Sequence, residues 1–184
     1  MNMDEAIDKL IGIEGAYSNN PNDSGGETMW GITIDEARRN GYNQPMRSMP
    51  RAEAARIYKS KYIIAPKLDK IWTVDQARIA YEVFDTGVNC GPKTAIKMFQ
   101  KALNALNRQG KDYPDITEDG DIGPKTLQAL QKFLQLRKLE GEIVLLKMLN
   151  VLQGSYYIDL ASRRMKDEEF IFGWFRNRID IPLR

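Results

Sequence analysis

Histidine is absent from this 184-residue chain, and cysteine occurs once. Without an imidazole the chain can have no Ser-His-Asp or Cys-His catalytic group, no histidine-ligated zinc and no histidine general base. Acid-base chemistry must therefore come from carboxyl groups. The single Cys90 excludes an internal disulfide, which suits synthesis in a reducing cytosol, and we expect it to be a small buried apolar side chain.

Long hydrophobic runs are also missing. No stretch approaches the roughly 18 consecutive apolar residues of a membrane-spanning helix, so we expect no membrane insertion. Residues 1–5 carry acids where a secretory signal would carry Lys or Arg, so we expect no Sec-type export signal. Apolar residues still make up 42% of the chain, which is enough for the core of one domain or of two small ones.

Charge is distributed unevenly along the first 70 residues. Residues 1–36 hold eight acids and one base, whereas residues 37–70 hold nine bases and two acids. Two interpretations are open. We favour the one in which the two segments form solvated helix faces whose charges cancel in space. The other is an acidic cleft rimmed by bases that approaches an anionic surface.

Apolar residues recur at helical spacing through most of the chain. A helix over 4–14 has Asn2 or Asp4 as a candidate cap, and a turn-rich loop or short β-hairpin over 15–26 follows it, near the candidate site. We expect an extended piece over 28–33, a short helix from Asp35 to Gly41, and further helices near 50–63 and over 74–88, 140–165 and 169–179. In the 50–63 helix, Ser48 is the candidate cap, and the inward side chains are Ala54, Ile57, Tyr58 and Tyr62.

The tetrapeptide Gly-Pro-Lys-Thr occurs at 91–94 and again at 123–126, each time before a helical run. Gly at the cap with Pro at the first helical position predicts a helix start at both places. The acidic loop between them lacks the alternating ligands and closing Glu of an EF-hand, so we expect no calcium there. The final segment contributes aromatics that we expect in the core: Phe170, Phe172, Trp174 and Phe175.

Residues 14–33 combine an acid at a helix end with a Gly- and Asn-rich loop, further acids, hydroxyls and aromatics. An enzyme hydrolyses a glycosidic bond with a carboxyl group that is still protonated and donates its proton to the leaving oxygen. At the inner end of a helix, burial and the helix carbonyls would both raise the pKa of Glu14. From spacing alone Glu14 is only a candidate. The same spacing is compatible with an exposed Glu14 or with an ion pair between Glu14 and a basic residue of the 38–70 segment.

A second carboxylate would activate water or stabilise positive charge on the sugar. Asp23 is our choice, because a polar loop keeps it ionised, although Glu27 is an alternative and Asp23 also suits a simple turn. Thr28 can position a water, and Trp30 can stack on a sugar face; packing roles explain both as well. Neither a metal nor a cofactor is expected.

The sequence Glu-Gly-Ala-Tyr-Ser-Asn-Asn-Pro-Asn-Asp-Ser-Gly-Gly-Glu-Thr-Met-Trp-Gly-Ile-Thr over 14–33 closely resembles the signature of glycoside hydrolase family 108. The resemblance implies a mainly α, lysozyme-like fold and N-acetylmuramidase activity of the kind found in phage endolysins. It implies Glu14 as the catalytic acid and matches Asp23 and Thr28 to the family's loop Asp and Thr. Ala16 and Asn20 depart from the signature. Tyr17, Glu27 and Trp30, inside the motif, are the candidate substrate contacts.

Three later segments, 84–94, 119–126 and 172–178, resemble the peptidoglycan-binding region that follows in this family. We therefore expect a muramidase region over 1–90 and a helical binding region over 91–184, packed as one compact unit because no Pro/Ser-rich linker separates them. The implied partner is the peptidoglycan glycan strand, with no nucleic acid. We expect a monomeric bacteriolytic, antimicrobial enzyme, made in the bacterial cytoplasm and released through a phage holin.

Two rival functions stay open at this stage. A lytic transglycosylase would use Glu14 alone and leave an anhydro product, and the presence of Asp23 argues weakly against it. A non-catalytic wall-binding or secretion-assisting protein would keep the scaffold without cleavage, and the intact Glu14 and Asp23 argue against that.

Overall fold

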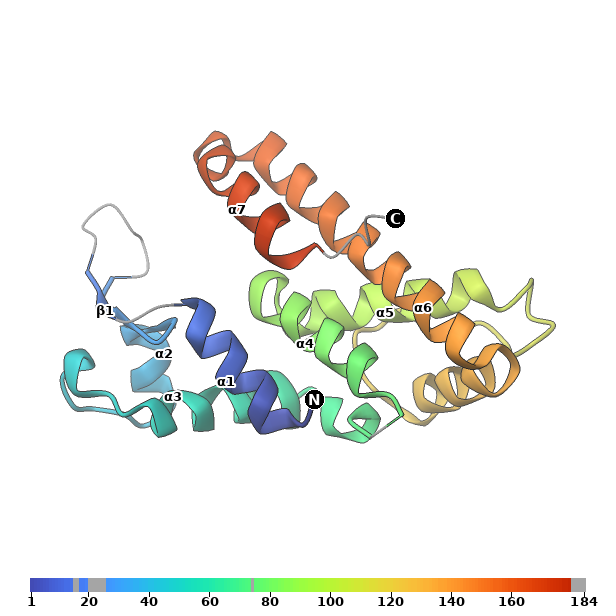
Figure 1. Ribbon diagram of the computed structural model, residues 1–184, viewed down its shortest axis with the longest axis horizontal. Helices are drawn as coiled ribbons and strands as arrows, with labels where there is room; N and C mark the ends of the chain where they lie inside the picture. The colour runs from blue at the N-terminus through green and yellow to red at the C-terminus, as the bar shows by residue number, and fades with distance from the viewer. Residues whose placement is uncertain (15–16, 20–25, 74, 180–184) are drawn as a thin grey trace. The chain divides into compact units, whose positions relative to one another are not determined.

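The computed structural model describes residues 1–14, 17–19, 26–73 and 75–179, and the chain forms two compact units, Met1–Ala65 and Pro66–Arg184. Helices dominate both units, and the described part of the first also holds a small antiparallel sheet (Figure 1). The predicted fold class, mainly α and lysozyme-like with a short β-hairpin, is confirmed.

Helix α1 (Met3–Glu14) begins at a reciprocal cap. The backbone N–H of Asn2 donates to the Glu5 carboxylate at 2.9 Å, and the N–H of Glu5 donates to the Asn2 side-chain oxygen at 2.9 Å. This arrangement satisfies two N–H groups that a helix start would leave unpaired. The buried face of the helix carries Ala6, Ile7, Leu10 and Ile11. The predicted helix is confirmed, with Asn2 as its cap.

The sheet consists of β1 (Tyr17–Ser18), β2 (Thr28–Met29) and β3 (Ile32–Thr33), each antiparallel to the next. The prediction of one extended piece over 28–33 is therefore wrong. The chain reverses at Trp30 and Gly31, whose φ angles are 55° and 78°. Two consecutive positive φ angles are the geometry of the two-residue hairpin turn that matches the twist of paired strands.

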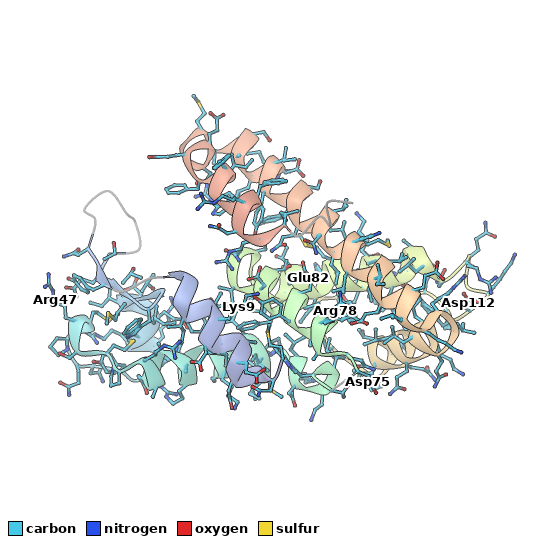
Figure 2. The ribbon with its side chains drawn as sticks, viewed as in Figure 1. Lys9, Arg47, Asp75, Arg78, Glu82 and Asp112 are labelled. Carbon is cyan, nitrogen blue, oxygen red and sulfur yellow. The ribbon has the colours of Figure 1, made fainter. Side chains whose placement is uncertain are left out.

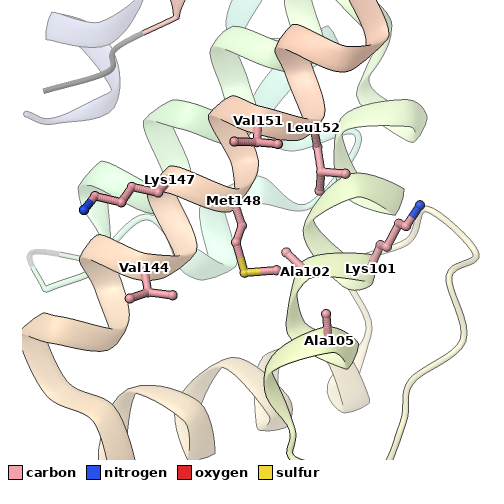
Figure 3. Close-up of a pocket in the computed structure, with 8 residues that line it drawn as sticks. All are labelled: Lys101, Ala102, Ala105, Val144, Lys147, Met148, Val151 and Leu152. Atoms are coloured by element: carbon pink, nitrogen blue, oxygen red, sulfur yellow. The ribbon is translucent and has the colours of Figure 1, made fainter.

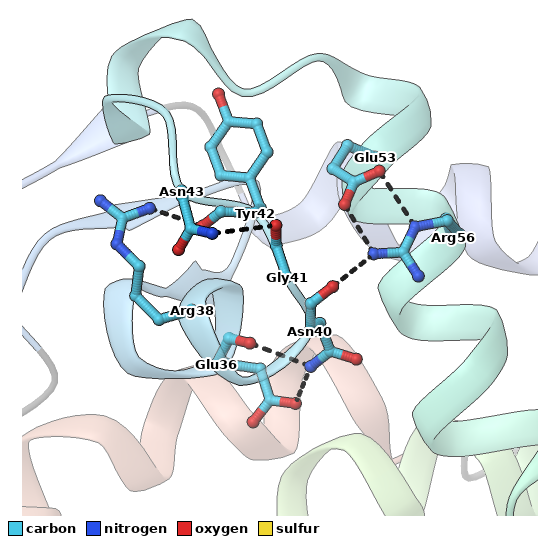
Figure 4. Close-up of polar contacts among 8 residues, drawn as sticks. All are labelled: Glu36, Arg38, Asn40, Gly41, Tyr42, Asn43, Glu53 and Arg56. Carbon is cyan, nitrogen blue, oxygen red and sulfur yellow. Dashed lines mark hydrogen bonds and ion pairs between the residues drawn. The ribbon is translucent and has the colours of Figure 1, made fainter.

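Helix α2 (Ile34–Arg39) is capped by the Thr33 hydroxyl, which accepts from the Glu36 N–H at 3.3 Å. The loop after α2 is tied back by side chains (Figure 4). Arg38 donates to the Tyr42 carbonyl at 2.6 Å, and the Asn40 amide donates to the Glu36 carbonyl at 2.9 Å. Arg56 on α3 (Arg51–Tyr58) donates to the Asn40 carbonyl at 2.8 Å, so the loop is held from both helices.

Two details of the predicted 50–63 helix are wrong. Ser48 lies in the 3-10 helix η1 (Met46–Ser48), and Pro50 occupies the start of α3 with no side-chain cap. After α3 the chain widens into the π-helix η2 (Lys59–Ile64), where the wider turn shifts the inward face by about one position. Ile63 is therefore fully buried, whereas Tyr62 is half-buried.

The second unit contains η3 (Leu68–Ile71), α4 (Ala77–Cys90), α5 (Pro92–Leu106), α6 (Pro124–Arg163), η4 (Met165–Asp167) and α7 (Glu168–Arg178). Both Gly-Pro-Lys-Thr sequences start helices as predicted, with Pro at the first helical position. Helix α6 bends at Lys138, where φ is 50° and ψ is −140°. The predicted 140–165 helix is the part of α6 after that bend.

The C-terminal aromatics differ from the prediction. Trp174 and Phe175 pack against Tyr157 of α6, with ring centroids 5.1 Å and 6.3 Å away. Phe170 and Phe172 are 54% and 75% exposed, so their assignment to the core is wrong. Residue 172 lies two positions from both 170 and 174, about 200° around a helix, and cannot share their face.

Candidate active site

Helix α1 ends at Glu14, and the sheet begins three residues later at Tyr17. The structure describes the backbone of Glu14 and not its side chain, and Asp23 lies outside the described residues. The described residues nearest to them in the sequence, 17–19 and 26–33, contain the three strands of the sheet. The predicted acid therefore lies at the C-terminal end of a helix, and the first strand follows three residues later in the sequence.

Tyr17 and Glu27 meet although ten positions separate them. The Tyr17 hydroxyl donates to the Glu27 carboxylate at 2.7 Å, because β1 and β2 pair with Tyr17 opposite Met29. The guanidinium carbon of Arg47 lies 4.3 Å from the centroid of the Tyr17 ring. Figure 2 labels Arg47 among the side chains of the first unit. A carboxylate, a phenol and a cation thus lie together at this end of the sheet.

Thr28 lies in the middle strand, between Ser18 of β1 and Thr33 of β3. Its hydroxyl donates to the Gly26 carbonyl at 3.4 Å, and the residue is half-buried. A hydroxyl that donates to the backbone keeps its lone pairs for a hydrogen bond from water. This chemistry is compatible with the water-positioning role, which stays a prediction.

Trp30 is fixed from two directions. Its indole N–H donates to the Met49 carbonyl at 3.0 Å, and its own carbonyl accepts from the Tyr58 hydroxyl at 3.1 Å. These contacts tie the hairpin turn to the segment that leads into α3 and to α3 itself. The described contacts give Trp30 a structural role, and stacking on a sugar stays a prediction.

The acidic and basic segments pair with each other across the first unit. Arg51 pairs with Asp8, Lys59 with Asp4 at 3.0 Å, and Lys61 with Glu36 at 2.6 Å. Burial by itself would raise the pKa of Glu36, but the hydrogen bond and charge of Lys61 outweigh it and hold that pKa below its usual value. The interpretation in which the two segments cancel in space is the one these pairs support.

Arg47 and the anchoring role of Tyr58 were missed by the sequence reasoning. Arg47 belongs to the basic segment, which was the available signal, but nothing in the spacing connects it to Tyr17. Among the described residues, no three potential His, Cys, Asp or Glu metal ligands lie together. Across the same residues, none of the helices is both long and apolar enough to cross a membrane.

The motif segments of the second unit meet in a buried polar cluster. Arg178 of α7 pairs with Asp85 of α4 at 2.7 Å, and Gln153 of α6 donates to Tyr157 at 3.0 Å and to Asp85 at 3.4 Å. The neighbouring Cys90 is buried as expected, and burial raises the pKa of its thiol to about 12. Two of the three recognised segments, 84–94 and 172–178, are therefore in direct contact.

The third segment is organised around Gln100, which is fully buried on α5. Its amide donates to the Asp119 carboxylate at 2.8 Å and to the Asp121 carbonyl at 3.0 Å, and its oxygen accepts from the Gly120 N–H at 2.8 Å. The acidic loop that the sequence left without a role is thus fixed to α5 by the Gln100 side chain.

Comparison with known proteins gives matches along most of the chain. The family described as glycosyl hydrolase 108 matches residues 7–91, and the one described as a predicted peptidoglycan domain matches residues 94–179. A search of the curated proteins found no match. Among solved structures, the Brucella abortus protein SagA is similar with a TM-score of 0.63 and 21% identity, over 95% of this chain and 96% of that one. That likeness shows the shared fold.

The junction between the two matches falls at the end of α4, whereas the compact units divide at residues 65 and 66. The division into regions 1–90 and 91–184, packed as one unit, stays a prediction. A glycosyl hydrolase region joined to a peptidoglycan domain indicates a glycoside hydrolase that acts on the peptidoglycan of the cell wall. The chain belongs to the glycosyl hydrolase 108 family over residues 7–91 and continues into a peptidoglycan-binding domain over residues 94–179.

Proposed function

We propose that the chain is an N-acetylmuramidase, which hydrolyses the β-1,4 bond between N-acetylmuramic acid and N-acetylglucosamine, with Glu14 as the general acid. The observation that carries the proposal is the family match over residues 7–91, which includes the whole 14–33 motif. Glu14 ends α1, where the helix carbonyls disfavour an ionised carboxyl and so favour the protonated form that donates to a leaving oxygen.

We place beside that acid the polar groups that the described residues of the first unit supply. Glu27 is held by the Tyr17 hydroxyl, Arg47 lies over the Tyr17 ring, and the half-buried Thr28 hydroxyl is on the adjacent strand. Hydrolysis needs a water and a second polar group on the sugar face opposite the acid. We assign the second carboxylate to Asp23 and keep Glu27 as the alternative. Tyr17, Glu27 and Trp30 are the proposed substrate contacts.

Product analysis tests which reaction occurs. Purified peptidoglycan would be digested with the wild-type chain, and the soluble fragments would be identified by mass spectrometry before and after borohydride reduction. The proposal predicts reducible N-acetylmuramic acid ends. Anhydro ends would show a lytic transglycosylase. Reducible N-acetylglucosamine ends would show that the enzyme hydrolyses the other glycosidic bond of the strand, and undigested peptidoglycan would support a non-catalytic protein.

We also propose the biological setting that the motif implies. The chain would act as a bacteriolytic, antimicrobial endolysin of a bacteriophage, made in the cytoplasm and released through a holin, as a monomer. Addition of the purified protein to bacteria with and without a permeabilised membrane tests this route. Lysis of permeabilised cells alone is the expected result.

A further inference from the structure

The second unit contains an open cleft that none of the motifs uses. It has a volume of about 790 Å³ and lies between the residues that lead into α4 and the part of α6 around its bend. This volume falls in the range of about 300–1,000 Å³ typical of ligand sites. Figure 2 labels Asp75 and Arg78, which line one wall. The cleft is formed by residues from both sides of the junction between the two family matches.

Glu142 is the buried charge of this cleft. Its side chain is 11% exposed, and among the described residues its one ion pair is with Arg78, at 3.8 Å. That separation is too long for a hydrogen bond. A largely buried carboxylate at the wall of an open cleft can accept hydrogen bonds from water, and a ligand N–H or ammonium can replace that water.

Arg78 supplies the opposite chemistry. Its side chain is 64% exposed, so the guanidinium can turn its N–H groups toward a ligand carboxylate. Lys138, at the bend of α6, adds a second exposed cation to the lining, and Asp75 adds a second carboxylate. Gln131 and Gln135 contribute exposed amides from successive turns of α6. The cleft therefore presents both signs of charge together with amide groups.

A second hollow in the same unit lacks this character. The groove between α5 and α6 has a volume of about 320 Å³ and is lined by aliphatic side chains with two lysines at its margins (Figure 3). Lys101 and Lys147 point away from Met148 at its centre. This apolar groove offers no acceptor for a charged peptide, so Lys147 provides a control outside the polar cleft.

We propose that the polar cleft binds the stem peptide of peptidoglycan and not its glycan strand. The inference rests on the proposed action on peptidoglycan. Peptide-bearing glycan strands offer neutral hydroxyl and N-acetyl groups, because the muramic acid carboxyl is used in the amide bond to the stem peptide. Stem peptides carry free carboxylates, amide N–H groups and the amino group of a diamino acid. Arg78 and Lys138 bind the carboxylates, and Glu142 accepts from the amino group or an amide N–H.

Calorimetric titration of the wild-type chain tests the assignment. One arm uses the soluble tetrapeptide L-Ala-γ-D-Glu-diaminopimelate-D-Ala, and the other uses a peptide-free N-acetylglucosamine oligosaccharide. The same titrations are run on Arg78→Gln, on Lys138→Gln and on the control Lys147→Gln. All three replaced side chains are solvent-accessible lysines or arginines at pocket margins, and circular dichroism checks that each variant is folded.

The expected result is tetrapeptide binding that Arg78→Gln and Lys138→Gln each weaken by about tenfold and that Lys147→Gln leaves unchanged. The inference would be overturned if the tetrapeptide did not bind or if all variants bound it with equal affinity. It would also be overturned if the oligosaccharide bound in a way that depends on Arg78. The outcome is separable from the proposed function, because the tetrapeptide contains no glycosidic bond. Failure to cleave glycan together with Arg78-dependent peptide binding would refute the muramidase proposal alone.

Discussion

At the scale of single residues, Trp30 shows how one side chain fixes a turn near the candidate site. Its φ of 55° is unusual for a bulky residue, and the indole hydrogen bond to Met49 holds it there. Trp30→Phe keeps an aromatic ring, although a smaller one, and removes the N–H that donates to the Met49 carbonyl. We expect the free energy of unfolding to fall by about 1–2 kcal/mol, measured by urea denaturation. Unchanged stability would mean that the indole N–H does not hold the turn.

The site residues illustrate what the sequence can and cannot predict at this scale. The spacing placed Tyr17, Glu27, Thr28 and Trp30 in one segment, but the Tyr17–Glu27 hydrogen bond depends on strand register. Register was hidden because the sequence pattern suggested one extended piece over 28–33 and no turn within it. Arg47 reaches Tyr17 across thirty positions, which no local pattern encodes.

At the scale of elements, Gly120 marks a close approach of two backbones. A Cβ at this position would lie 2.8 Å from the Lys93 carbonyl oxygen, whereas one at Gly110 would meet nothing within 4 Å. Both glycines have positive φ, 80° and 78°, so both alanine variants carry the same backbone penalty of about 1 kcal/mol. We expect Gly120→Ala to lower the thermal midpoint clearly more than Gly110→Ala. Equal midpoints would contradict the close approach.

The Lys61–Glu36 pair joins η2 to α2 and predicts a pH dependence. The pKa of Glu36 is below its usual 4.5 in the folded chain, so the pair's contribution is fully present above pH 4.5 and is lost as pH falls through the folded pKa. Glu36→Gln removes this contribution at every pH. The difference in unfolding free energy between wild type and variant should therefore be constant at neutral pH and shrink in acid. A difference that grows in acid would contradict the sign of the shift.

Helix positions were predicted well because apolar spacing and the two Gly-Pro starts are local signals. The errors came from features that change the period or depend on neighbours. Because η2 is a π-helix, Ile63 and not the predicted Tyr62 lies in the core, and no composition signal marks such a widened turn. On α7 the number of aromatics exceeded what one helix face can bury, so Phe172 is exposed.

At the scale of the whole molecule, the second unit depends on the Asp85–Arg178 pair, which joins α4 to the last helix. Both side chains are at most 10% exposed. Asp85→Asn removes the negative charge that faces the buried guanidinium of Arg178, which should cost about 3 kcal/mol of unfolding free energy. The matched control is Lys70→Gln, which breaks the exposed pair with Asp69 at 3.2 Å and should cost under about 1 kcal/mol. Similar losses of unfolding free energy in both variants would show that the buried pair stabilises the fold no more than the exposed one.

The organisation of the whole chain was predictable only through the motifs. The spacing of apolar residues indicated a helical protein, and the absence of histidine indicated carboxyl chemistry. The 14–33 signature indicated the family that the match over 7–91 confirms. The polar cleft was not predictable, because Arg78 and Glu142 are 64 positions apart in the sequence and meet only after α4 and α6 pack.

The central claim is that the carboxyl group of Glu14 donates the proton that releases the sugar. The most direct measurement is the initial rate of reducing-end formation from purified peptidoglycan by wild type, Glu14→Gln and the control Asp35→Asn, an exposed acid in α2. We predict that Glu14→Gln lowers the rate by at least about 100-fold, since general acid catalysis contributes on that order, and that Asp35→Asn retains it. A Glu14→Gln variant that cleaves as fast as wild type would contradict the account.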